Sequence, residues 1–277
     1  MSDRTASKRE NAISANRAAY DELAARRAPL CRPASDADLV DPLPTVDPLG
    51  WLGPTVVGKQ LLCLAAGGGR QSMIYAVAGA RVTVVDVSPA MLQLDRQAAA
   101  QRGLTITTIE ASMDAMPMLS DAAFDLVVHP VSTCYLPDIQ AVFREVARVL
   151  RPGGVYVSQH KQPTSLQAST VRIAGNYAVV HPYYRTQPIP TPPQETAASL
   201  RLRERDAIEY LHRWEQIVGG ICRSGFVIED LVEPVHVESG AKNNSFADRA
   251  QFIAPYVRIK ARRQQAATGP RRPQLIL

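Results

Sequence analysis

The sequence predicts an α/β protein: a Rossmann-like, doubly wound, mostly parallel sheet with an antiparallel edge strand, an N-terminal helical cap and a lid-like insertion. Three observations carry this prediction. Short apolar runs alternate with helical patterns between residues 60 and 158, as in βαβ units. Three glycines at 67–69 follow the first run at once, as a turn between strand and helix requires. Residues 256–263 alternate between apolar and basic side chains, which is typical of an antiparallel edge strand with one wet face.

The first 54 residues predict a cap and an irregular approach segment. Residues 9–27 are rich in alanine and charge and predict a surface helix that ends before Pro29. Five prolines between residues 31 and 54 exclude a long helix, because proline lacks the amide donor and clashes with the preceding turn. We therefore assign residues 1–54 to this N-terminal unit.

Residues 55–160 form the predicted core, whose strands are short, apolar and rich in β-branched residues. Ser88 and Pro89 predict a helix start, as a side-chain cap followed by proline in the first turn, and Gly103 predicts its end. Helices are expected after the first, second and fourth strands. The expected strands are 60–65, 81–86, 105–109, 124–128 and 155–158.

After residue 160 the pattern changes. Residues 161–212 combine many prolines with Tyr177, Tyr183 and Tyr184, and predict an insertion that acts as a substrate lid. Residues 213–263 return to regular patterns and complete the sheet with a helix and two strands. The last residues, 264–277, form a basic tail.

The composition is that of a globular protein. Apolar residues make up 46% of the 277 residues, and no apolar run approaches the ~18 needed to cross a bilayer. The N-terminus has no continuous apolar stretch, so we expect no secretory signal and a cytoplasmic location. The four cysteines are widely spaced and lack paired Cys or His spacing, so we expect neither a disulfide framework nor a metal site.

The formal net charge of +5 is concentrated near the end of the chain. Six basic residues and no acidic ones follow from Arg258 onward, which leaves the body close to neutral. The tail also lacks aromatic residues that could stack on bases. We therefore expect a small-molecule partner and neither nucleic acid nor membrane, with the oligomeric state left open.

The strand, glycine turn, helix and second strand ending at Asp86 indicate an adenosine-containing ligand. The glycines at 67–69 let the backbone turn sharply and approach a ligand closely. Asp86 follows Gly67 by 19 residues, at a strand end where a carboxylate can accept both ribose hydroxyls. A dinucleotide site requires a glycine where this chain has Ser72, so the fit to a nicotinamide cofactor is poor.

Across residues 55–160, and more faintly to 263, the chain resembles the class I S-adenosylmethionine-dependent methyltransferases of the small-molecule type. Several motifs carry the resemblance in the family's order. They are LLCLAAGGG for the first strand and loop, VVDVSPAML for the ribose-binding acid, EASMDAMPM around the adenine, FDLVVHP for the fourth strand and EVARVLRPGG before the fifth.

This resemblance implies that S-adenosylmethionine is bound and S-adenosylhomocysteine released. Three positions depart from the family: Cys63 replaces an acid that organises the glycine loop, Ala65 replaces the first glycine, and Ser112 replaces the adenine-facing acid. The departures put affinity rather than fold in question. The implied cofactor-binding residues are Ala65, Ala66, Gly67, Asp86, Val87, Met91, Ser112, Met113 and His129.

The acceptor site is expected where the fifth strand ends. His160 lies there and is a candidate general base for an acceptor hydroxyl or amine. In-line displacement at an activated methyl group also proceeds by alignment alone, so the need for a base stays open. The candidate substrate-binding residues are Tyr20, Tyr135, Tyr177, Tyr183 and Tyr184.

The predicted function is transfer of a methyl group from S-adenosylmethionine to a small molecule, with N-, O- and C-methylation all open. A nicotinamide-dependent oxidoreductase is one alternative. A module that binds S-adenosylmethionine without turnover is the other, and the altered first motif keeps it open.

Overall fold

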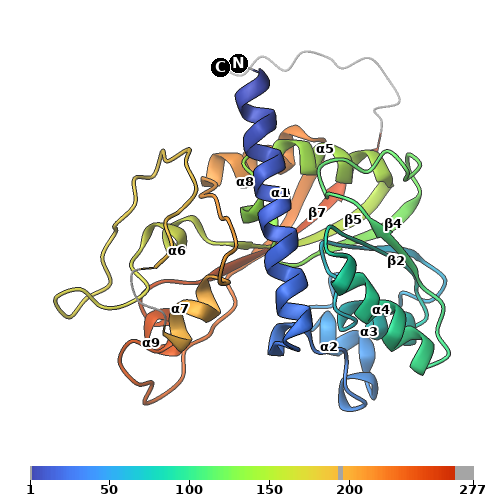
Figure 1. Ribbon diagram of the computed structural model, residues 1–277. Helices are drawn as coiled ribbons and strands as arrows, with labels where there is room; N and C mark the ends of the chain where they lie inside the picture. The colour runs from blue at the N-terminus through green and yellow to red at the C-terminus, as the bar shows by residue number, and fades with distance from the viewer. Residues whose placement is uncertain (1, 193–195, 266–277) are drawn as a thin grey trace.

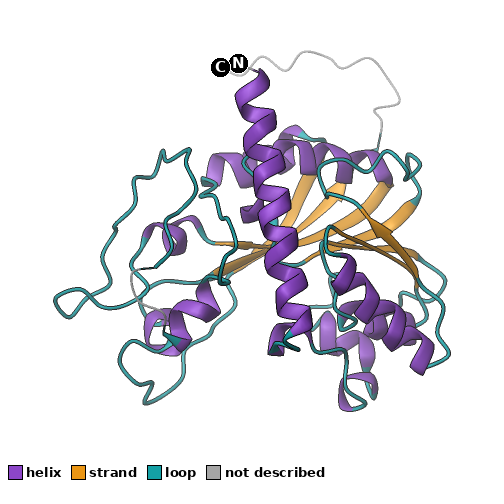
Figure 2. Ribbon diagram, in the orientation of Figure 1, coloured by secondary structure: helices purple, strands orange, loops and turns teal. Residues whose placement is uncertain are grey.

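The computed structural model describes residues 2–192 and 196–265, which contain one seven-stranded sheet with helices on both faces (Figure 1 and Figure 2). The strand order is β3-β2-β1-β4-β5-β7-β6. β1 to β5 run parallel to one another, and β7 runs antiparallel to β5 and β6. The predicted α/β fold with a mostly parallel sheet is therefore confirmed. The strands are β1 (Gln60–Leu64), β2 (Arg81–Asp86), β3 (Thr107–Glu110), β4 (Phe124–His129), β5 (Leu150–Lys161), β6 (Phe226–Val232) and β7 (Tyr256–Arg263).

Helices cover the two faces with separate core clusters. Phe143 of α5 and Ile221 of α8 pack with Leu62 and Tyr156 on one face. The other face is covered by α3 and the approach segment. The α-helices of the described residues are α1 (Ser2–Ala25), α2 (Pro42–Val46), α3 (Gln71–Val77), α4 (Pro89–Gln101), α5 (Gln140–Val149), α6 (Pro163–Gln167), α7 (Ala197–Leu202), α8 (Trp214–Arg223) and α9 (Phe246–Ala250).

The sheet positions a ligand site by its topology. The strand order reverses between β1 and β4, and a parallel sheet opens a crevice at the carboxyl ends of its strands where this happens. The cap predicted at Ser88 is confirmed, because its hydroxyl accepts a hydrogen bond from the Met91 amide at 3.1 Å. This cap begins α4 directly beside the crevice.

β7 is antiparallel as predicted, but its position at the edge is wrong, because β6 pairs outside it. Its alternating pattern reports burial on one face and says nothing about how many neighbours the strand has. Lys260 and Arg262 on the wetter face form ion pairs with Glu229 of β6, which accounts for the basic side chains inside the sheet. β5 is also longer than predicted, since Leu150 already pairs with Phe124.

The insertion at 161–212 lies beside α1 (Figure 1) and holds α6, α7 and long irregular stretches. It joins the core through backbone hydrogen bonds such as Tyr210 N to Cys134 O at 2.7 Å. Of the basic tail at 264–277, all but the first two residues lie outside the described residues. Among the residues that are described, no helix is long and apolar enough to cross a membrane.

Candidate active site

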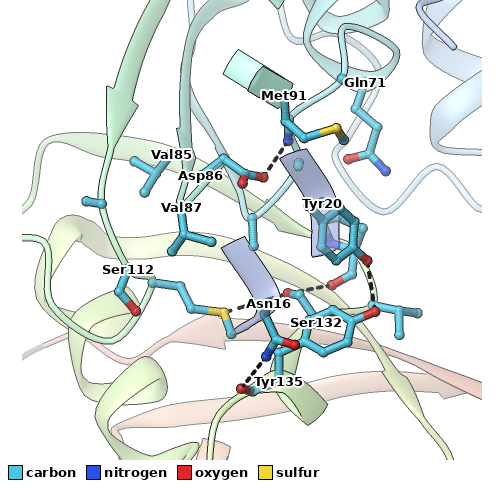
Figure 3. A pocket seen from close by; sticks show the side chains of 18 of the residues that line it. Asn16, Tyr20, Gln71, Val85, Asp86, Val87, Met91, Ser112, Ser132 and Tyr135 are labelled. Atoms are coloured by element: carbon cyan, nitrogen blue, oxygen red, sulfur yellow. Dashed lines mark hydrogen bonds between the residues drawn. The ribbon is translucent and has the colours of Figure 1, made fainter. Parts of the chain in front are cut away.

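A cavity of ≈ 290 Å³ lies at the carboxyl ends of β1 to β4 (Figure 3). Small-molecule sites of proteins typically have volumes of about 300–1,000 Å³, so this cavity lies at the lower end of the range. Eight of the nine predicted cofactor residues line it, His129 being the exception. The predicted residues Tyr20 and Tyr135 line it as well. α1 forms the wall opposite the carboxyl ends of the strands.

Ala65 begins the loop after β1 in a left-handed conformation, with a φ of 48°. Its amide donates to Val85 O at 2.7 Å, which ties the loop to β2. The left-handed region costs a residue with a Cβ about 1 kcal/mol or more, and glycine does not bear this cost. The backbone at Ala65 therefore has the conformation that the family's glycine adopts freely.

We expect Ala65→Gly to raise the free energy of unfolding by about 1 kcal/mol, because it removes this strain. Urea denaturation measures the change. Ala66→Gly is the matched control. Ala66 is not in the left-handed region, so replacing it by the more flexible glycine should lower the free energy of unfolding. Equal stabilities of Ala65→Gly and the parent would contradict the expectation.

Asp86 ends β2 at the wall of the cavity and holds the glycine loop. Its two carboxylate oxygens accept hydrogen bonds at 2.9 Å, one from the Gly67 amide and one from the Ser88 amide. Burial raises the pKa of Asp86, and these backbone amides act against the rise. Each carboxylate oxygen keeps a lone pair that can accept a further hydrogen bond.

Gly67 and the residues after it are held by close packing and by a second carboxylate. A Cβ on Gly67 would lie 2.7 Å from Met91 Cβ, so this position accepts only glycine without movement of α4. Asp95 of α4 accepts hydrogen bonds from the amides of Gly68 and Gly69 at 2.9 and 3.0 Å, and from the Ser72 hydroxyl. Asp95 was not among the predicted site residues, although an acid on the buried face of α4 is a detectable signal.

Ser112 and its neighbours form the side of the cavity at the end of β3. The Ser112 hydroxyl donates to Asp114 Oδ1 at 2.5 Å, and Asp114 forms an ion pair with Arg9 of α1. An acid therefore lies two residues beyond the position where the family has one. The Arg9 hydrogen bond helps to keep the pKa of Asp114 below its usual value although burial raises it.

α1 is fastened to the core and to the insertion on either side of the cavity. Asp21 accepts hydrogen bonds from the Ser88 hydroxyl at 2.6 Å and from the Ala90 amide at 3.2 Å. Asn16 donates to the carbonyls of Tyr135 and Ile208 at 3.0 and 3.1 Å and accepts from the Ile208 amide at 2.7 Å. Sequence reasoning missed Asn16, because nothing in an alanine-rich helix marks one asparagine as a clamp.

His129 does not line the cavity, in contrast to the prediction. Its ring nitrogens bond to the Tyr156 hydroxyl at 2.8 Å and to Ser132 Oγ at 2.6 Å. Burial lowers its pKa to about 3, so the imidazole is neutral at pH 7. Its partner Ser132 does line the cavity.

His160 is likewise buried away from the cavity. Its Nδ1 bonds to Thr133 Oγ1 and its Nε2 to Ser158 Oγ, both at 2.8 Å. Burial lowers its pKa to about 3, with smaller contributions from His129 and His212. With both nitrogens occupied and no face on the cavity, His160 has a structural role here, and we withdraw the expectation of a base at this position.

Three of the five predicted substrate tyrosines lie elsewhere. Tyr177 donates to Asp248 at 2.8 Å, and the Tyr183 hydroxyl accepts from the Trp214 amide at 3.4 Å. Tyr184 is 75% exposed. Tyr177 and Tyr183 fix the insertion to the body, and no described residue of 161–212 lines the cavity.

Comparisons with known proteins identify the family of this chain. A family model described as a methyltransferase domain matches residues 62–158. The uncharacterized methyltransferase YbaJ of Bacillus subtilis (strain 168) is 34% identical over 189 residues, which cover 67% of this chain and 72% of YbaJ. The chain belongs to the class I S-adenosylmethionine-dependent methyltransferases.

Two further proteins are similar to the methyltransferase. A crystal structure of an S-adenosylmethionine-dependent methyltransferase from Mesorhizobium loti shares the fold, with a TM-score of 0.61 and 23% identity over 78% of this chain and 96% of that chain. The malonyl-[acyl-carrier protein] O-methyltransferase of Serratia marcescens is 34% identical over 116 residues, or 42% of this chain and 44% of its own length. The methyltransferase is thus an enzyme that uses S-adenosylmethionine.

The residues of the cavity fit this cofactor. Asp86 presents two carboxylate oxygens, each with a lone pair left after its backbone hydrogen bond, which suits the two hydroxyls of a ribose. Val87 and Met113 offer apolar surface beside it. Within the described residues no group of three or more His, Cys, Asp or Glu side chains is placed to hold a metal ion.

Proposed function

We propose that the methyltransferase binds S-adenosylmethionine with its ribose on Asp86 and its adenine beside Val87, Ser112 and Met113, and methylates a small molecule held against α1. The observation that carries the proposal is one cavity with two chemically different walls. The sheet-side wall holds Asp86 and the glycine loop, and the other wall holds Asn16, Tyr20 and Tyr135.

The way in which α1 walls the cavity supports a small acceptor. α1 is tied to α4 through Asp21 and to the insertion through Asn16, so the wall it forms is held from both sides. A cavity of ≈ 290 Å³ closed in this way suits a small molecule better than a polymer. The similar Serratia marcescens enzyme is named for methyl transfer to oxygen, and O-methylation is the outcome we favour.

Methyl transfer requires above all that the acceptor is aligned with the methyl group. When bound, S-adenosylmethionine supplies an electrophilic methyl group on a positively charged sulfur. The protein holds the acceptor close to that group and in line with it, and such positioning alone lowers barriers substantially. In this proposal the insertion supports the acceptor wall through Ile208 and does not cover it as a lid. The expected cytoplasmic location stays a prediction.

We expect Asp86→Ala to weaken binding of S-adenosylhomocysteine about tenfold to a hundredfold. A hydrogen bond to a charged group contributes about 1.5–3 kcal/mol, and the ribose would lose such bonds. Isothermal titration calorimetry measures the change. Asp121→Ala is the matched control, since Asp121 is an exposed acid in an ion pair with Arg148 away from the cavity.

Circular dichroism of both variants establishes that they are folded. Unchanged affinity in folded Asp86→Ala would show that Asp86 does not hold the ribose. A parent protein that bound a nicotinamide dinucleotide and neither S-adenosylmethionine nor its product would refute the proposed function.

A further inference from the structure

Two tyrosines of the cavity form a hydrogen-bonded chain that leads out of it. The hydroxyls of Tyr20 and Tyr135 are 2.8 Å apart, and the two side chains point toward one another (Figure 3). The Tyr135 hydroxyl donates to Glu204 Oε2, also at 2.8 Å. A tyrosine hydroxyl has a single proton, so Tyr135 must accept from Tyr20. The proton of Tyr20 is then committed as well, and its oxygen can only accept from a ligand.

Glu204 belongs to a buried cluster with balanced charges. Lys161 Nζ lies 3.1 Å from Glu204 Oε2 and 2.7 Å from Glu209 Oε1, and Arg203 Nε lies 2.7 Å from Glu209 Oε2. Burial raises the pKa of Glu204, but the charge of Lys161 and the hydrogen bonds from Tyr135 and Lys161 together outweigh it and hold that pKa below its usual value. The Glu204 carboxylate is therefore ionised at pH 7 and accepts hydrogen bonds without donating one, which fixes the direction of the chain.

The direction of this chain of hydrogen bonds favours one chemical class of methyl acceptor. A carboxylate acceptor has no proton to donate and would meet the lone pair of Tyr20 with a negative charge. A methylated amine is an ammonium ion with a pKa near 10, which does not give its proton to a carboxylate of lowered pKa. A hydroxyl oxygen that gains a methyl group becomes strongly acidic, and such a carboxylate takes its proton readily.

We propose that the methyl acceptor is a hydroxyl compound that donates a hydrogen bond to the Tyr20 hydroxyl, and that its proton passes through Tyr20 and Tyr135 to Glu204. This inference rests on the proposed function. Tyr20 is then a catalytic residue, and Glu204 is a positioning residue that acts through Tyr135.

The step balances in atoms and charge. The acceptor oxygen forms a bond to the methyl carbon while the carbon–sulfur bond breaks, and the sulfur keeps the electron pair. One proton moves from the acceptor to Tyr20, one from Tyr20 to Tyr135 and one from Tyr135 to Glu204. The positive charge on sulfur and the negative charge on Glu204 disappear together, and Glu204 later loses its proton to water.

Binding of phenol and toluene tests the chain without turnover. Parent and Tyr20→Phe are both saturated with S-adenosylhomocysteine, and the Kd of phenol and the Kd of toluene are measured for each. The ratio of the toluene Kd to the phenol Kd should be about twofold to tenfold lower in Tyr20→Phe than in the parent, because the variant loses one neutral hydrogen bond to phenol. Tyr75→Phe is the control, since Tyr75 is buried in α3 and does not line the cavity. An unchanged ratio, or tighter binding of benzoate than of phenol, would overturn the proposal.

Turnover gives the second test. The parent is incubated with methyl-labelled S-adenosylmethionine and a small-molecule metabolite extract, and label should appear in ethers. Label in an ester cleaved by mild base, or in a basic amine, would overturn the hydroxyl assignment while leaving the methyltransferase activity intact. Failure of the parent to bind S-adenosylhomocysteine or transfer any label would overturn both proposals, so the two failures are distinguishable.

Tyr135→Phe then breaks the relay without removing a charge from the cluster. We expect kcat for the labelled acceptor to fall about 100-fold, a typical loss for general base catalysis, with the KM for S-adenosylmethionine unchanged. Glu204→Gln should likewise lower kcat and leave the KM for S-adenosylmethionine unchanged. An unchanged kcat in folded Tyr135→Phe would show that the proton leaves by another route.

Discussion

Replacement of Lys161 by methionine is expected to lower the free energy of unfolding by about 3–5 kcal/mol. Lys161 is 5% exposed and its ammonium lies between Glu204 and Glu209, the second of which is fully buried. Removing one partner of a buried ion cluster leaves uncompensated charge in a poorly solvated place, and this is costly even where the intact cluster contributes little. Methionine keeps most of the apolar volume, so the loss reports the charge.

Urea denaturation at pH 7 measures this loss. Lys260→Met is the matched control, because Lys260 pairs with Glu229 at 3.0 Å on the wetter face of β7 and such pairs contribute about 0–1 kcal/mol. Adding Glu209→Gln to Lys161→Met should recover part of the loss, since it brings the net charge of the remaining cluster, Arg203 and Glu204, back to zero. Equal losses in the two lysine variants would refute the buried cluster.

The second large effect expected is a pH dependence of stability from Asp95. Burial raises its pKa to about 6 from an ordinary value of 3.8, while hydrogen bonds from Ser72, Gly68 and Gly69 act against the rise and the charge of Asp86 adds to it. The folded protein therefore keeps the Asp95 proton to a higher pH than the unfolded chain does. The free energy of unfolding should fall by about 3 kcal/mol from this group as pH rises from about 4 to about 6.

Comparison with Asp95→Asn isolates this contribution from other titrating groups. The free energy of unfolding of the parent minus that of the variant should fall as pH rises through this window and stay constant above it. A difference that is flat between pH 4 and pH 6 would show that Asp95 is not a raised, buried acid in the folded state.

Strand and helix patterns predicted the sheet well because they record burial directly. β1, β2 and β4 were placed within a residue, and the Ser88 cap fixed the start of α4. The sheet-side wall of the cavity was also accessible from sequence, because its residues follow strand ends in chain order. Neighbour order was not accessible, and for that reason β7 was placed at the edge.

The wall formed by α1 and Tyr135 was harder to predict, because it depends on where side chains point. His129 and His160 were chosen because they end strands, yet successive residues of a strand face opposite sides, and both imidazoles face the packed core. His160 lies against Phe143 of α5, with ring centroids 6.2 Å apart. Asn16 and Glu204 were missed because their partners are distant in the chain, and no local pattern encodes such contacts.

The clamp at Asn16 has a consequence for how the protein is assembled during synthesis. Asn16 and its partner Ile208 are 192 positions apart, and Tyr135 is 119 positions from Asn16. α1 is made before the insertion, so the hydrogen bonds between Asn16 and Ile208 must wait for it, and contacts of such long range form slowly because a large loop must close. A nascent chain therefore cannot hold α1 through the Asn16–Ile208 hydrogen bonds before the insertion has been made, although Asp21 can already bind Ser88 and the Ala90 amide.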